Sequence, residues 1–118
     1  MAPTCRCSRP PAPALRYRDY YVKEKGDFAA AHNLIETLIP NSQSALGDQY
    51  REMTENFIAG YSAMPLVGTP EQVVDGMAAM ARAGFDGLTL SWVDYDEGLA
   101  QYRDQLRPLL IQAGLRAE

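Results

Sequence analysis

The feature that most constrains the fold is one well-delimited helix between two short apolar runs. Thr69 can cap this helix, Pro70 suits its first turn, and Gln72 completes a capping box, so the helix is predicted to begin at residue 70. Gly84 tolerates the left-handed conformation that ends many helices, so the end is predicted near residue 83. The predicted buried face recurs at helical spacing and consists of Val73, Val74, Met77, Met80 and Ala81.

The apolar runs on either side of this helix predict two strands. Residues 64–68 form a brief apolar run with a proline near its start, and residues 88–93 alternate between an apolar and a mixed face. A last helical region is predicted after the turn at residues 94–96, where Pro108 kinks or restarts it before Gly114 ends it. The order strand, helix, strand, helix builds parallel sheets and (β/α)₈ barrels.

Two strands do not make a barrel, because a complete one needs about 250 residues. A parallel pair alone would also leave both of its edges unpaired and one of its faces bare. The sequence therefore predicts an α/β fold that is the C-terminal fragment of a (β/α)₈ TIM barrel, preceded by a helical region.

The first half of the chain predicts a tail and then helices. Residues 1–14 are rich in proline and arginine and offer little to bury, so they are predicted to be a disordered tail. Residues 15–61 show helical apolar spacing, interrupted by Gly26, after which Asp27 can cap the next helix, and by a polar turn at residues 41–44. The predicted organisation is thus this tail, a helical region over 15–61, and two strand-helix units over 64–118.

Composition and charge exclude several classes of protein. The net charge is −4 and no basic stripe exists, which argues against a nucleic acid partner. No apolar run is long enough for a membrane span and no secretory signal is recognisable, so a cytoplasmic protein is expected. Cys5, Cys7 and the single histidine, His32, do not make up a metal site, and they suggest no catalytic residue.

Four short motifs resemble, in order and spacing, the last part of the bacterial luciferase-like flavin-dependent monooxygenases. They are Leu66-Val67-Gly68-Thr69-Pro70-Glu71-Gln72-Val73, Ala83-Gly84-Phe85-Asp86-Gly87, Ser91-Trp92-Val93-Asp94-Tyr95, and Leu106-Arg107-Pro108-Leu109-Leu110 with Ala113-Gly114-Leu115-Arg116. The resemblance implies that residues 66–67 and 88–92 are strands seven and eight of the barrel. The helical region over 15–61 is similar to the long insertion before strand seven in one branch of that family.

The family's activity follows as an implication of this resemblance. Its members use reduced FMN, supplied by a separate flavin reductase, and O₂ to oxygenate a substrate. Most of the residues that hold FMN in the family come from strands one to six, which this sequence does not contain. We therefore expect a fragment that is inactive alone and does not bind FMN tightly, and whose partner is the missing barrel half or a second copy.

Barrel enzymes place their sites at the C-terminal ends of the strands, which here offers five pocket-lining candidates. They are Gly68, Thr69, Ser91, Trp92 and Asp94. Thr69 and Asp94 have an alternative role as helix caps, and Trp92 can pack beneath the helices. The alternative function is a non-catalytic interaction module that binds another protein or itself.

Overall fold

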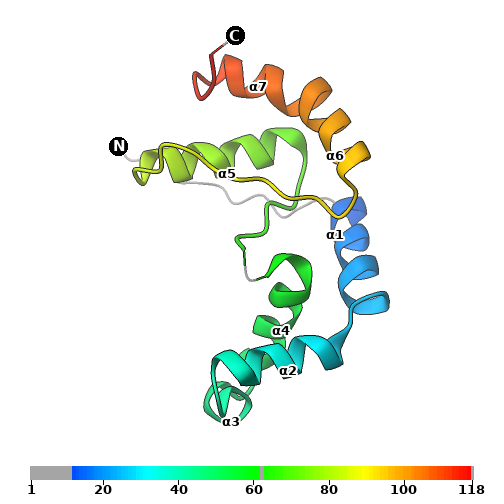
Figure 1. Cartoon of the computed structure of the whole chain (residues 1–118). Helices are drawn as coiled ribbons and strands as arrows, with labels where there is room; N and C mark the ends of the chain where they lie inside the picture. Colours follow the sequence, from blue (N-terminus) through cyan, green and yellow to red (C-terminus); the bar gives the residue numbers. More distant parts are fainter. Residues whose placement is uncertain (1–11, 62, 118) are drawn as a thin grey trace. The chain divides into compact units, whose positions relative to one another are not determined.

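The computed structural model describes residues 12–61 and 63–117, and every regular element in these ranges is a helix (Figure 1). Close contacts divide the chain into two compact units, one of residues 16–65 and one that contains residues 66–117. The elements, in chain order, are α1 (Ala12–Asp19), the π-helical turn η1 (Tyr20–Glu24), α2 (Phe28–Leu38), α3 (Ser42–Leu46), α4 (Gln49–Gly60), α5 (Pro70–Arg82), α6 (Tyr95–Gln101), the π-helical turn η2 (Tyr102–Leu106) and α7 (Arg107–Gln112).

The prediction of an α/β barrel fragment is wrong. Neither residues 66–67 nor residues 88–92 form a strand, and the described part of the chain is an all-helical fold. The sequence pattern favours an extended backbone, but a strand also needs a neighbour to share its hydrogen-bond ladder. The two apolar runs do not pair with each other, so both remain irregular connections between helices.

The unit of residues 16–65 packs α2 against α4. The side chain of Asp27 accepts a hydrogen bond from the Ala30 N–H, so α2 is capped by the residue that the sequence suggested. Ile35 of α2 is almost fully buried, as are Val22 of η1 and Tyr50 of α4. These side chains form the apolar centre of a small helical unit.

Two local expectations in the first half of the chain need correction. Helix α3 begins inside the stretch 41–44 that was predicted as a polar turn, because the Glu36 carboxylate holds the start of this helix. The carboxylate accepts hydrogen bonds from the Asn41 N–H, the Ser42 hydroxyl and the Gln43 N–H. Helix α1 begins at Ala12, inside the predicted tail, because a helix tolerates Pro13 in its first turn. The rest of that tail, with both cysteines, lies outside the described residues.

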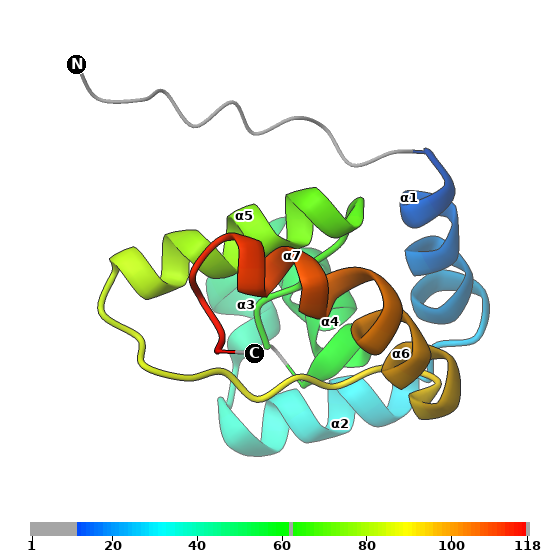
Figure 2. The same cartoon turned by 90° about the horizontal axis from the view of Figure 1, so that it is seen from above.

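The unit that contains residues 66–117 is built on α5. Thr69 and Gln72 form the predicted capping box, with the Gln72 N–H donating to Thr69 Oγ1 (3.3 Å) and the Thr69 N–H donating to Gln72 Oε1 (3.0 Å). After the helix, Gly84 has the positive φ that was predicted, +101°. Figures 1 and 2 show α7 running alongside α5, and the buried core between them consists of Val74, Met77, Leu106 and Leu110.

The last helical region is not a regular α-helix throughout. Asp94 caps α6 by accepting from the Glu97 N–H, and η2 then joins α6 to α7. Pro108 lacks an N–H and its ring crowds the carbonyl four residues earlier, so a wider turn just before it relieves the conflict. This is the irregularity that the sequence predicted at Pro108.

Among the described residues, no helix combines the length and apolar character that crossing a membrane requires.

Candidate functional site

The most unusual surface of the molecule is the α5–α6 connector, which we define as residues 86–93. It appears as an uncoiled stretch between the two helices in both views (Figures 1 and 2). Within the part of the chain that the structure describes, its backbone N–H and C=O groups make no hydrogen bond. The connector contains no proline, so each of its residues presents both a donor and an acceptor.

Two side chains hold the connector against the helices. Leu90 packs on the apolar core between α5 and α7. Trp92 is half-buried over α6, where its indole lies against Gly98 and makes an edge contact with the Tyr102 ring at 6.4 Å between centroids. Thr89, which precedes Leu90, and Ser91, which lies between Leu90 and Trp92, are exposed. The connector thus has one anchored face and one face open to solvent.

Within residues 66–117, the exposed large apolar side chains lie in the connector or next to it in sequence. All of them fall between positions 85 and 99, namely Phe85, Leu88, Val93, Tyr95 and Leu99. Phe85 is 61% exposed and Val93 is 59% exposed. Exposed apolar side chains concentrated in one stretch of a unit favour a protein interaction site.

The five predicted pocket residues take local roles in two stretches of the chain. Thr69 and Asp94 act as caps of α5 and α6, and Gly68 lies against the Gln72 side chain. Ser91 is exposed on the open face of the connector, and Trp92 packs on α6. Across the described residues, no hydrogen bond or ring contact joins the start of α5 to the Ser91–Asp94 stretch.

The start of α5 does not suit an FMN phosphate. A helix N-terminus binds phosphate through free N–H groups and a favourable dipole. Here the N–H groups of Thr69 and Gln72 are already used in the capping box, and the carboxylate of Glu71 occupies the first turn. Hydrogen bonds hold the pKa of Glu71 below its ordinary value, so this negative charge persists in weak acid. We derive no flavin chemistry from these residues.

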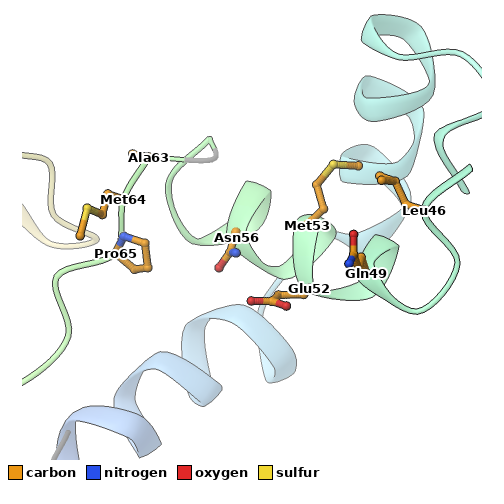
Figure 3. Close-up of a pocket in the computed structure, with 8 residues that line it drawn as sticks. All are labelled: Leu46, Gln49, Glu52, Met53, Asn56, Ala63, Met64 and Pro65. Atoms are coloured by element: carbon orange, nitrogen blue, oxygen red, sulfur yellow. The ribbon is translucent and has the colours of Figure 1, made fainter. Parts of the chain in front are cut away.

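Two open hollows lie in the unit of residues 16–65. The first, of about 420 Å³, is bordered mainly by α4 and by the stretch that follows it (Figure 3). Its lining mixes apolar and polar side chains that share no hydrogen bond among the described residues: Leu46, Gln49, Glu52, Met53, Asn56, Ala63, Met64 and Pro65. Nothing in this lining defines a particular ligand or reaction.

The second hollow, of about 490 Å³, contains the chain's only histidine. The Tyr50 hydroxyl lies 3.2 Å from Nδ1 of His32, and the two rings meet edge to face. The imidazole tautomer decides which of the two groups donates in this hydrogen bond. The hydroxyl of Thr54, also in the lining, donates to the Tyr50 carbonyl of its own helix, so it is not activated as a nucleophile. Asp48 also lines this hollow, but within the described residues no hydrogen bond joins its carboxylate to His32.

Acidic groups are arranged for structure and not for metal binding. In the described ranges, no cluster of three or more His, Cys, Asp or Glu side chains is placed to hold a metal ion. The Glu36 carboxylate accepts hydrogen bonds from the Ser42 hydroxyl and the Gln43 N–H, and these bonds lower its pKa. Its role is to fix the start of α3.

Comparison with protein-family models, with curated proteins and with solved structures found no match for this chain. The luciferase-like resemblance therefore stays a prediction, and the site must be judged on its own geometry.

Sequence reasoning did not identify the exposed apolar side chains around the connector. Phe85, directly after the Gly84 helix stop, is 61% exposed. One signal was available, because a strand with no neighbour must leave its backbone and outward side chains exposed. The barrel hypothesis attributes those unpaired edges to a missing remainder of a barrel and not to a site.

Proposed function

We propose that the chain is a non-catalytic association module that binds an extended segment of a partner protein along the α5–α6 connector. The connector would act as one strand, and the partner segment would pair with it by backbone hydrogen bonds. This mode of recognition adds a strand to an exposed edge.

The observation that carries the proposal is the unpaired backbone of the connector, held in place from one side. An extended strand directs its side chains to two faces and its N–H and C=O groups to two edges. Leu90 and Trp92 fix one face on the helices, so both edges remain accessible to a partner. Anchoring before binding reduces the conformational entropy that association must overcome.

The size of the core supports the same function. In residues 66–117 the buried apolar core consists of four side chains, while five large apolar side chains around the connector are exposed. Small units with small cores commonly depend on a partner for part of their stability. Covering Phe85, Leu88 and Val93 would supply that stabilisation.

A peptide titration tests the proposal. The probe is an eight-residue acetylated and amidated peptide of alternating valine and threonine with glutamine at each end, added to the full chain. We expect saturable binding, together with slower hydrogen exchange at the amides of residues 87–92. A peptide that binds without protecting these amides, or that fails to bind, would contradict the proposal.

Two chain variants serve as a matched pair in this titration. Ser91→Pro removes one backbone N–H from the connector and should abolish binding, whereas Ser91→Val keeps the N–H and should bind as well as the original chain. Equal binding by both variants would show that backbone pairing is not the mode of recognition. Within this proposal we place the module in the cytoplasm.

A further inference from the structure

The connector is bordered by negative charge at both ends. Asp86 lies at its start, and Asp94, Asp96 and Glu97 follow its end. No Lys or Arg occurs between Arg82 and Arg103, so no basic side chain of the same stretch offsets these carboxylates. None of the four takes part in an ion pair among the residues that the structure describes.

Local structure explains the charge at one end only. Asp94 caps α6, and Asp96 and Glu97 in its first turn are favoured by the helix dipole. Asp86 has no such role, because it belongs to no helix and lies beyond the end of α5 at Arg82. An exposed carboxylate without a local structural role is one that a binding partner can use.

We propose that the partner segment carries basic side chains at both ends of its apolar centre, and that the partner is a different protein and not a second copy of this chain. This inference rests on the proposed function, since it specifies the occupant of the same connector. A basic residue at each end of the bound strand would lie beside Asp86 and beside the Asp94–Glu97 stretch. Such complementary charge selects the partner and fixes the register of the paired strands.

Pairing between two copies is disfavoured by the same charges. In an antiparallel pair centred on Leu90, Asp86 of one copy would face Asp94 of the other. In a parallel pair in register, Asp86 would face Asp86. Like charges directly opposite each other destabilise a pair of strands, so both arrangements are disfavoured.

The test compares three peptides with the same valine and threonine centre and with lysine, glutamine or glutamate at both ends. We expect the lysine peptide to bind the full chain about 3- to 10-fold more tightly than the glutamine peptide at low salt, from two exposed charge pairs. The glutamate peptide should bind more weakly than either. The preference should shrink at high salt, where such pairs are screened.

Matched variants locate the charges responsible. Asp86→Asn with Asp96→Asn removes two charges beside the connector and leaves the Asp94 cap intact, so the lysine preference should fall to about 2-fold or less. Asp75→Asn with Glu24→Gln removes the same net charge from exposed positions elsewhere and should leave the preference unchanged. Hydrogen exchange on both variants verifies that the helices remain folded.

The possible results separate the proposed function from the inference of a basic partner. If the glutamine peptide protects the connector and the lysine peptide binds no better, the basic partner is overturned while strand association stands. If no peptide protects the connector, both proposals fail. If light scattering shows a dimer whose formation protects the connector amides without any peptide, the occupant is a second copy and the inference of a different partner is overturned.

Discussion

The indole of Trp92 lies so close to the backbone of Gly98 on α6 that a methyl group at position 98 would overlap the ring. Position 98 is buried, and Tyr95 and Tyr102 border the same indole, with ring centroids 5.8 and 6.4 Å away. This contact holds the end of the α5–α6 connector on α6. Several of the properties expected of the chain depend on it.

Gly98→Ala should displace Trp92 and lower the free energy of unfolding by about 1–3 kcal/mol, because the added methyl group has no space. The chain has a single tryptophan, so its fluorescence emission should shift to the red as the indole becomes exposed to water. Gly87→Ala is the matched control, since a Cβ there would contact nothing within 4 Å. Equal effects of the two substitutions would show that the Trp92 contact is absent in solution.

Gly84→Ala should lower the free energy of unfolding by about 1–2 kcal/mol, because the residue after α5 has a φ of +101°, which a side chain disfavours. No neighbouring atom would obstruct the new Cβ, so the effect reports on backbone conformation alone. Chemical denaturation of the two proteins measures the difference. An unchanged midpoint would mean that α5 does not end at this residue.

Glu36 should make stability depend on pH in the acid range. Its folded pKa is lowered by hydrogen bonds from the Ser42 hydroxyl and the Gln43 N–H, so its stabilising effect is fully present above the unfolded pKa of about 4.3. That effect is lost as the pH falls from this value through the lowered folded pKa. Urea unfolding between pH 6 and pH 2 measures the loss.

Glu36→Gln should reduce stability at pH 6 and flatten its decline in acid, because an amide does not titrate in this range. The control Glu24→Gln alters an exposed residue of η1 whose side chain makes no hydrogen bond or ion pair within the described residues. If the free energy of unfolding of the original chain and of Glu36→Gln fell in parallel as the pH is lowered, the Glu36 carboxylate would not be what stabilises the start of α3.

FMN should not bind this chain with micromolar or higher affinity. The N–H groups of Thr69 and Gln72 at the start of α5 already have partners, and Glu71 would repel a phosphate group. Titration of the protein into FMN, followed by flavin fluorescence, measures the interaction. A dissociation constant at or below about 1 μM would restore the flavoprotein hypothesis for the isolated chain.

The helices of this chain were largely predictable because their signals are local. Thr69 with Gln72, Asp27 and Asp94 each cap the helix that follows, as expected from sequence alone. Helix α3 was missed because its start depends on Glu36, a residue of the preceding helix whose side chain reaches forward along the chain. The helix propensities of residues 41–44 could not indicate that contact.

The strands were predicted wrongly for a different reason. Alternation corresponds to structure over residues 89–92, since Leu90 and Trp92 face the helices while Thr89 and Ser91 are exposed. Leu88, predicted on the same face as Leu90, is exposed. Alternation reports which side chains face a core, but a strand is defined by a hydrogen-bonded neighbour that the pattern does not contain. Of the pocket-lining candidates, Thr69 and Asp94 cap separate helices, α5 and α6.

Native-state hydrogen exchange of the full chain, with and without the glutamine-ended peptide, tests the central claim most directly. In the free protein, the amides of Leu88, Leu90 and Trp92 should exchange near the rates of an unstructured chain, because they have no hydrogen-bond acceptor, while amides in the middle of α5 should be protected. The peptide should slow exchange in the connector and leave α2 unchanged. Connector amides as protected as those of α5 in the free protein, or unaffected by saturating peptide, would contradict a strand-accepting function.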